Sequence, residues 1–320
     1  MNLQLPGYDD VRAARERLAG RIAHTPVLHA RSIDERAGCA VYFKCENLQR
    51  AGAFKFRGAM NRLLQLTPEE RRRGILAFSS GNHAQAVALA ARELGIDAAL
   101  VMPHDAPRTK LEAVRDFGGH VHLYERGKVN REAFARELLE KEGRVLVPPF
   151  DDPHIVAGQG TAALELLDEV PDLDTLVTPA GGGGLVSGTA LAAHGRNPQI
   201  RVWGVEPATA ADIQLSLAQG RITPIEDNPT IADGLRTVQP GEITFQLMRA
   251  HLAGIATVTD AQLIDALKLL LLRAKVLVEP SGAAGMAAVL ARAIPGARRV
   301  GVILSGGNID PQTLAGFLAE

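Results

Sequence analysis

Short apolar runs alternate with longer amphipathic stretches along most of the chain. The apolar runs predict strands at residues 75–78, 98–102, 120–124, 175–178, 202–205 and 299–304. The stretches between and after them predict helices at residues 82–94, 107–117, 131–141, 160–169, 185–194, 260–273, 281–292 and 311–318. Strands that alternate with helices form βαβ units. We therefore expect an α/β fold with open, mostly parallel sheets that carry helices on both faces.

Two breaks in this alternation indicate a division into domains. One is the Pro148-Pro149 pair with the Asp-Asp-Pro run at 151–153, and the other is Thr67-Pro68 with the charged run at 69–73. We expect residues 72–150 between them to form a small domain. This domain would be inserted in a larger one made of residues 1–68 and 152–320, so that the chain has two three-layer αβα domains.

Composition excludes several classes of function. The 320 residues are 46 % hydrophobic and 22 % charged, with a net charge of −1 and no basic block for nucleic acid or an anionic membrane surface. No apolar stretch is long enough to span a membrane. Cys39 and Cys45 are too few for a disulfide framework, and the N-terminal residues lack a signal-peptide pattern. We therefore expect a cytoplasmic protein.

Four consecutive glycines follow the strand expected at 175–178. In Gly181, Gly182, Gly183 and Gly184, backbone N–H groups can converge beside a helix N-terminus, which favours a bound phosphate or carboxylate. A tight turn is the alternative, but a turn needs only one or two glycines. Residues 158–163 match the dinucleotide pattern GxGxxA, but no acidic residue follows about 20 positions later. We interpret this second pattern as close helix packing.

Two further loops follow predicted strands. One is Ser79-Ser80-Gly81-Asn82-His83, and the other begins at Ser305. Taken alone, the first is better explained by helix N-capping, and His83 by a structural role. However, ligands of open parallel sheets bind outside the carboxyl ends of the strands. We therefore expect both loops and the glycine loop to converge on one pocket.

Lys55 lies between Phe54 and Phe56, ahead of a helix. Burial would lower the pKa of its amine and make it a nucleophile suited to Schiff-base chemistry. On this feature alone, an ordinary surface lysine remains the simpler explanation. The protein would then be a non-catalytic binder of a phosphate ligand.

Together, the motifs resemble those of one enzyme family. The chain contains "AFKFRGA" around Lys55, then "SSGNHAQA", "PAGGGGLVSG", "VEPSGA" and "LSGGN", in this order. It is similar to the pyridoxal-phosphate (PLP) enzymes of the tryptophan-synthase-β fold type, also called fold type II, and above all to serine/threonine dehydratases and serine racemases. The likeness runs from about residue 24 to residue 310. It implies that pyridoxal 5'-phosphate lies in the cleft between the two domains.

The resemblance also implies the residues that hold the cofactor. Lys55 would bind it as a Schiff base and later exchange protons at the substrate Cα. Asn82 would hydrogen-bond the ring hydroxyl, and Ser305 the ring nitrogen. Phe54 would pack beside the ring. The phosphate would be bound by Gly181, Gly182, Gly183 and Gly184.

For the substrate, the resemblance implies a second set of residues. The α-carboxylate would be received by the loop of Ser79, Ser80, Gly81, Asn82 and His83. Ser80 would be the acid–base group on the face opposite Lys55. Arg131 matches a position that approaches the substrate in racemase-like members, where it could bind a second substrate carboxylate.

Glu206, Ala210 and Asp212 follow the strand expected at 202–205. Their two carboxylates and the Ala210 carbonyl are oxygen ligands of the kind that hard cations prefer. A surface pair of acids is the simpler explanation of these residues alone. The resemblance implies a divalent cation here, either Mg²⁺, Mn²⁺ or Ca²⁺.

The resemblance implies a PLP-dependent threonine/serine dehydratase (ammonia-lyase). It would convert L-threonine to 2-oxobutanoate, or L-serine to pyruvate, with release of ammonia by α,β-elimination. The alternative is a serine racemase or a 3-hydroxyaspartate dehydratase. A hydroxyl such as that of Ser305 makes the cofactor ring a milder electron sink than a carboxylate would, which disfavours an aminotransferase. We expect a small amino acid as partner, no nucleic acid or membrane, and a homodimer or homotetramer.

Overall fold

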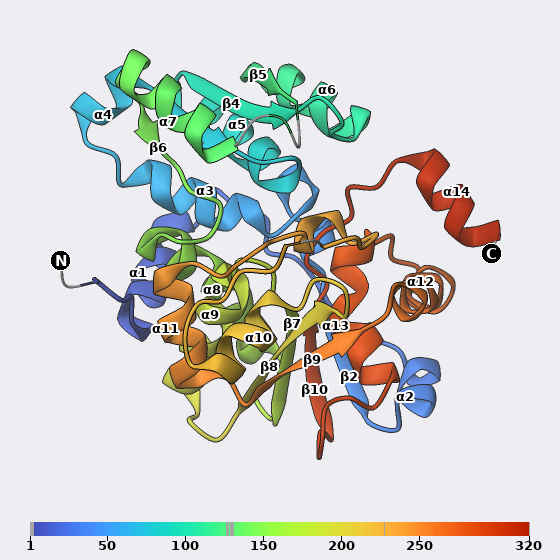
Figure 1. Ribbon diagram of the computed structural model, residues 1–320. Coiled ribbons are helices and arrows are strands. Elements are labelled where there is room, and N and C mark those ends of the chain that lie inside the picture. Colours follow the sequence, from blue (N-terminus) through green and yellow to red (C-terminus); the bar gives the residue numbers. More distant parts are fainter. Residues whose placement is uncertain (1–2, 126–127, 129–130, 227, 320) are drawn as a thin grey trace.

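The computed structural model describes residues 3–125, 128, 131–226 and 228–319, without the side chains of Arg131 and Glu132. Figure 1 shows two units, each built around its own sheet, with the smaller above the larger. The strands of the larger unit are β1 (Val27–His29), β2 (Ala40–Lys44), β7 (Thr175–Pro179), β8 (Arg201–Pro207), β9 (Gly254–Val258) and β10 (Arg299–Ile303). Those of the smaller unit are β3 (Ile75–Phe78), β4 (Ala98–Pro103), β5 (His120–Tyr124) and β6 (Val145–Leu146).

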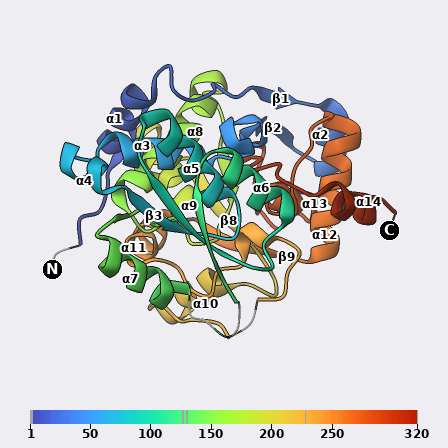
Figure 2. The ribbon, with the colours of Figure 1, turned by 90° about the horizontal axis from the view of Figure 1, so that it is seen from above.

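Helices cover both sheets, as seen from a second direction in Figure 2. The smaller unit has α4 (Pro68–Arg73), α5 (Asn82–Leu94), α6 (Arg108–Asp116) and α7 (Arg131–Glu142). The larger has α1 (Tyr8–Leu18), α2 (Arg31–Ala37), α8 (Pro153–Glu169), α9 (Gly184–Arg196), α10 (Asp212–Gln219), α11 (Glu242–His251), α12 (Asp260–Leu269), α13 (Pro280–Leu290) and α14 (Pro311–Ala319). Helix α3 (Lys55–Leu64) packs against both α5 and α8, and its buried apolar side chains join the core of the smaller sheet. Short 3₁₀ turns lie at Glu46–Leu48, Arg50–Gly52 and Asp233–Leu235, and a π-helical turn at Leu270–Ala274.

The topology confirms the expected α/β fold. The larger sheet has the order β1-β2-β10-β7-β8-β9, and the smaller has the order β5-β4-β3-β6. β1 pairs with β2 in antiparallel fashion, and the other paired neighbours run parallel. The strands of the smaller sheet lie between residues 75 and 146, inside the segment expected to form the small domain. The boundaries at 68, 72, 150 and 152 remain a prediction.

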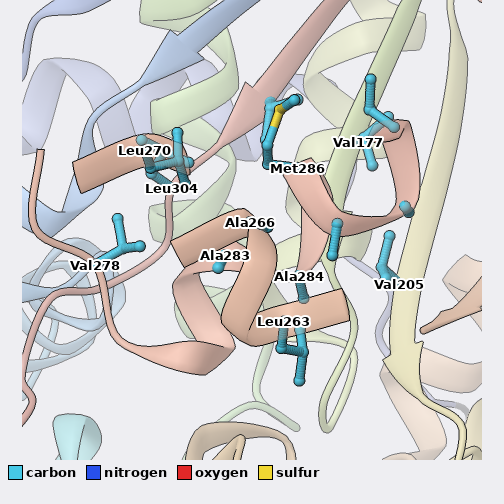
Figure 3. Packing of buried hydrophobic residues seen from close by; sticks show 14 of the residues in the cluster. Val177, Val205, Leu263, Ala266, Leu270, Val278, Ala283, Ala284, Met286 and Leu304 are labelled. Atoms are coloured by element: carbon cyan, nitrogen blue, oxygen red, sulfur yellow. The ribbon is translucent and has the colours of Figure 1, made fainter. Parts of the chain in front are cut away.

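Apolar side chains of neighbouring strand positions pack on opposite faces of each sheet. In the larger sheet, Val177 belongs to the core under α12 and α13, whereas Leu176 belongs to the core under α8 and α9. Figure 3 shows the first of these cores, where Met286 of α13 and Leu263 of α12 lie near the strands. Such alternation buries both faces, as expected for a three-layer arrangement.

Two segments that we interpreted as breaks begin or form helices. The charged run at 69–73 lies in α4, where the Thr67 hydroxyl accepts from the Glu70 N–H at 3.2 Å and the Glu70 carboxylate accepts from the Thr67 N–H at 2.8 Å. Asp152 caps α8 by accepting from the N–H groups of His154 and Ile155. Helix α8 therefore begins at Pro153, seven residues before the predicted start at 160. A proline in the first turn favours a helix start, which explains the error.

The GxGxxA pattern lies inside α8 and is a packing feature. A Cβ on Gly158 would lie 2.7 Å from the Cα of Gly58 in α3. A Cβ on Gly160 would lie 2.6 Å from the carbonyl oxygen of Gly188 in α9. Both neighbours are backbone atoms that cannot move aside, so α8 can approach α3 and α9 only through glycine. This confirms our interpretation of the pattern.

Candidate active site

The expected pocket lies between the two sheets. It is lined by the loop after β3 with Ser79 and Ser80, by the loop after β7 with Gly181, and by Ser305 after β10. Lys55 lines it too, from the start of α3. The structure thus brings the three loops together at the carboxyl ends of their strands, as the sequence predicts.

Lys55 points its amine into this pocket from the first residue of α3. Its Nζ donates to the carbonyl oxygen of Pro149 at 2.7 Å and lies 5.1 Å from the ring centroid of Phe54. Burial lowers the pKa of the amine from 10.5 to about 8. An appreciable fraction of Lys55 is therefore neutral and nucleophilic near neutral pH.

Arg57 anchors the first turn of α3 from inside the protein. Its guanidinium donates to both oxygens of Glu46 at 2.7 Å and to the two oxygens of Glu165 at 2.7 and 2.8 Å. Lys44 is also buried and lies 2.7 Å from Glu165. Two cations and two carboxylates thus compensate one another, and their bidentate geometry holds α3 in one orientation relative to α8. This network limits the movement of Lys55.

The glycine loop forms the opposite wall. Gly183 has a φ of +94°, and a Cβ on Gly182 would lie 2.1 Å from the Phe150 ring. The hydroxyl of Thr244 donates to the carbonyl oxygen of Gly182 at 2.7 Å, which fixes the loop from behind. Helix α9 begins at Gly184, so the positive end of its dipole faces the loop. The loop therefore presents backbone N–H groups, without side chains, to an anion.

Helix α5 offers a second anion site through its N-terminus. Gly81 is its N-cap, and the Gly81 N–H donates to the Ser79 hydroxyl at 3.1 Å. The N–H groups of the first turn have no acceptor inside the helix. His83 adds no charge, because burial and the nearby Lys55 charge lower its pKa to about 3. Its Nε2 lies 3.0 Å from the Val147 carbonyl and must donate to it, so any contribution to anion binding comes from the His83 backbone.

Asn82 belongs to a network that we did not predict. Its Nδ2 donates to a carboxylate oxygen of Glu279, and its Oδ1 accepts from Asn308 at 3.0 Å. The buried ammonium of Lys110 donates to Glu279 at 3.1 Å and to Asp233 at 2.7 Å. Burial acts against the charge, but the two carboxylates raise the pKa of Lys110. The network joins α6 of the smaller unit to the larger unit across the pocket.

Ser305 and Phe54 lie close together at the pocket wall. Ser305 is buried, and its carbonyl oxygen accepts from the Phe54 N–H at 3.0 Å. Next to them, Ala53 bridges to Gly306. The Glu279 carboxylate also reaches this wall, but Lys110 and Asn82 already engage it. Because this carboxylate is already paired, the group that this wall offers to a ligand is the neutral hydroxyl of Ser305.

Glu206 and Asp212 form a buried acidic pair outside the pocket. Glu206, at the end of β8, accepts from the N–H groups of Ile213 and Gln214 at 2.9 Å. Asp212 accepts from Thr237 at 3.0 Å through Oδ1, whereas its buried Oδ2 has no partner among the described atoms. Burial raises the pKa of Asp212 to about 6 and that of Glu206 well above its ordinary value. Ala210 lies between them and is buried. Among the residues described, no third His, Cys, Asp or Glu side chain joins the pair.

The side chain of Arg131, at the start of α7, lies outside the described part of the structure. Its expected contact with the substrate therefore stays a prediction. Within the described ranges, no helix has both the length and the apolar character needed to cross a membrane.

Comparisons with known proteins identify the family. The family profile "Pyridoxal-phosphate dependent enzyme" matches residues 18–306. A serine racemase of Schizosaccharomyces pombe is 48 % identical over 100 % of this chain and 99 % of its own. An L-threo-3-hydroxyaspartate ammonia-lyase of Saccharomyces cerevisiae is 46 % identical over 98 % and 97 %. The solved structure of maize serine racemase has a TM-score of 0.94 at 41 % identity, covering 99 % of this chain and 98 % of that one. The chain thus belongs to the fold-type II PLP enzymes, in the family of serine/threonine dehydratases (carbon–nitrogen lyases) and serine racemases.

Proposed function

We propose that the protein is a PLP-dependent ammonia-lyase that acts on small amino acids with a hydroxyl on Cβ. The net reaction converts L-serine to pyruvate and ammonia, or L-threonine to 2-oxobutanoate and ammonia. The observation that carries this proposal is the pocket itself. An amine of lowered pKa, a cradle of backbone N–H groups and a second helix N-terminus line one cavity.

The cofactor site fits a phosphorylated ring. A Cβ at Gly182 would overlap the Phe150 ring, and one at Gly183 would lie 2.7 Å from Thr244, so only glycine allows the close backbone path that forms the cradle for a phosphate. Lys55 provides the amine, and Phe54 and Ser305 provide an apolar face and a neutral hydroxyl for the ring. Asn82 keeps one amide N–H for the ring hydroxyl, since the other donates to Glu279. When bound, pyridoxal phosphate supplies an electron sink for the bonds of the substrate Cα.

The residues of the chain then supply binding and proton transfer. The N–H groups at the start of α5 bind the substrate α-carboxylate, which fixes the position of Cα. Lys55 takes the Cα proton as general base, because its amine is neutral in an appreciable fraction. The neutral Ser305 favours loss of the Cβ hydroxyl over transamination, because it does not hold a proton on the ring nitrogen.

A serine racemase is a second candidate, and Ser80 favours it. Ser80 lines the pocket on the loop before α5, whereas Lys55 enters from α3. Two acid–base groups on opposite faces of Cα can exchange its proton on either side. The similarity to two serine racemases supports this candidate. The similarity to an L-threo-3-hydroxyaspartate ammonia-lyase supports the ammonia-lyase reaction, with 3-hydroxyaspartate as the substrate in place of serine or threonine.

The wild-type protein is expected to release a 2-oxo acid and ammonia from at least one of L-serine, L-threonine and 3-hydroxyaspartate. The measurement couples oxo-acid formation to a reductase and separates serine enantiomers by chiral chromatography. Borohydride reduction followed by peptide mass spectrometry should place the pyridoxyl group on Lys55. A pyridoxyl group on another lysine, or neither product from any of these substrates, would contradict the proposal.

We also propose that Glu206 and Asp212 hold a divalent cation, Mg²⁺, Mn²⁺ or Ca²⁺, with the Ala210 carbonyl and water completing the shell. Two buried carboxylates repel each other unless a proton or a cation lies between them. The buried Oδ2 of Asp212 accepts no hydrogen bond from the described residues, so its lone pairs are free to coordinate a cation. Because Thr237 binds Asp212 and also lines the active site, a cation would stabilise one wall of the pocket.

Removal of the cation by EDTA is expected to lower the melting temperature and the activity. A cation present at 100 times its Kd stabilises the native state by about 2.7 kcal/mol, and chelation removes this contribution. Metal analysis should find about one equivalent in the wild type and less in Glu206→Ala and Asp212→Ala. Unchanged metal content and stability in both variants would exclude a cation at this position.

A further inference from the structure

Not every cationic side chain that lines the pocket has an anionic partner. Three cationic side chains line it, from Lys55, Lys110 and Arg236. Lys110 is held by Asp233 and Glu279, which are the two carboxylates among the described lining residues. Lys55 is the amine assigned to the cofactor. Arg236 is therefore the cation in this wall that the described residues leave without an anionic partner.

Arg236 is nevertheless held in place. Its Nε and Nη2 donate to the carbonyl oxygen of Thr230 at 2.8 and 2.6 Å. These two bonds fix the plane of the guanidinium and leave Nη1 free to donate elsewhere. A cation fixed before the ligand arrives loses little conformational entropy on binding.

The loop that carries Arg236 is held at several points. The Thr230 hydroxyl donates to Asp260 at 2.6 Å, and the Gly234 N–H donates to the Ser281 hydroxyl at 3.0 Å. At the other end, Thr237 donates to Asp212 at 3.0 Å. These contacts come from three different parts of the larger unit. Arg236 is an exposed residue, but these contacts hold its loop, and the Thr230 carbonyl holds its guanidinium.

Arg236 lies on the substrate side of the pocket. It also lines an adjoining hollow together with Ser80 and Lys110, and no residue of the glycine loop lines that hollow. Four carboxylates line the hollow as well, and two of them, those of Asp233 and Glu279, are engaged by Lys110. The other two belong to Asp105 and Asp310. In the proposed function, Ser80 faces the substrate Cα, and the α-carboxylate lies at the start of α5. A substrate whose Cβ carries a further anionic group would therefore direct it toward the wall that holds Arg236.

Building on the proposed function, we propose that Arg236 binds the side-chain carboxylate of a dicarboxylic substrate and makes 3-hydroxyaspartate the preferred hydroxy amino acid. A guanidinium matches a carboxylate with parallel N–H donors. L-Serine and L-threonine have no group that could use this charge. Water solvates Arg236 when they bind, so they gain nothing from it.

The test compares two substrates in two variants. Arg236→Gln should lower the ratio of kcat/KM for L-threo-3-hydroxyaspartate to kcat/KM for L-serine by roughly 10- to 100-fold, the range expected for a lost charge-assisted hydrogen bond. Arg236→Lys should recover part of this ratio, because it restores the charge without the planar pair of donors. Arg221→Gln removes an exposed arginine outside the pocket and should leave the ratio unchanged.

A binding measurement separates this proposal from the proposed function. Calorimetry of the holoenzyme with succinate should show weaker binding in Arg236→Gln by a similar factor, whether or not any substrate turns over. A ratio within threefold of wild type, or equal losses on both substrates, would overturn the assignment. So would loss of succinate binding in Arg131→Gln with none in Arg236→Gln. If no substrate releases a 2-oxo acid but succinate binding depends on Arg236, the proposed function fails and the carboxylate site stands.

Discussion

Replacing Lys55 by alanine is expected to reduce turnover by more than the roughly 10²–10⁴-fold that a single general acid or base contributes. The variant loses two functions, because the same amine attaches the cofactor and removes the Cα proton. Its fold should persist, since Arg57 continues to anchor α3 to Glu46 and Glu165. Steady-state rates with saturating pyridoxal phosphate measure the effect.

The control is Lys141→Ala, which removes an exposed lysine in the last turn of α7 and should retain wild-type rates. A Lys55→Ala variant with activity within tenfold of wild type would disprove the assignment. The lowered pKa gives a second measurement. Covalent uptake of the cofactor by the apo-protein should accelerate as the pH rises through about 8, because the protonated amine below that value is not a nucleophile.

The sequence predicted strands and helices best where local pattern determines them. Ile75–Phe78 and Asn82–Leu94 were predicted to the residue, because a buried parallel strand and a strongly apolar helix leave a clear signal. β2 was missed, since it ends in Lys44, a residue typical of surfaces. In the structure Lys44 is buried because Glu165 compensates it from α8. Helix α11 was missed as well, and its first N–H groups are capped by Asp151, about 90 residues earlier.

In the active site, too, the sequence predicted the parts that follow from local pattern and topology, and missed the parts that depend on contacts between distant residues. The glycine loop, the Ser79–His83 segment and Ser305 each follow a predicted strand, so topology alone brings them together. The triad of Lys110, Asp233 and Glu279 could not be predicted in this way. Lys110 is separated by 123 residues from Asp233 and by 169 from Glu279, and it lies in a helix whose composition resembles that of a surface helix. Only the tertiary structure shows that its ammonium is buried.

Ser80→Ala is expected to separate the two enantiomers of serine. Loss of an acid–base group on the face opposite Lys55 should slow any reaction of D-serine, and racemisation, by roughly 10²–10⁴-fold. Elimination from an L-amino acid needs only the Lys55 face, so its rate should fall much less. Rates of 2-oxo acid release from L- and D-serine, measured on the same preparation, give the comparison.

Ser79→Ala is the matched control for the alternative that Ser80 only supports the start of α5. The structure assigns that support to the neighbouring residue, because the Ser79 hydroxyl accepts from the Gly81 N–H at 3.1 Å. Loss of such a bond costs about 1 kcal/mol of stability and should affect both enantiomers alike. If Ser80→Ala lowers the rates for L-serine and D-serine by the same factor, Ser80 has only a structural role. A selective loss for D-serine, absent in Ser79→Ala, would instead establish a proton donor on each face of the substrate Cα, which racemisation requires and dehydration of an L-amino acid does not.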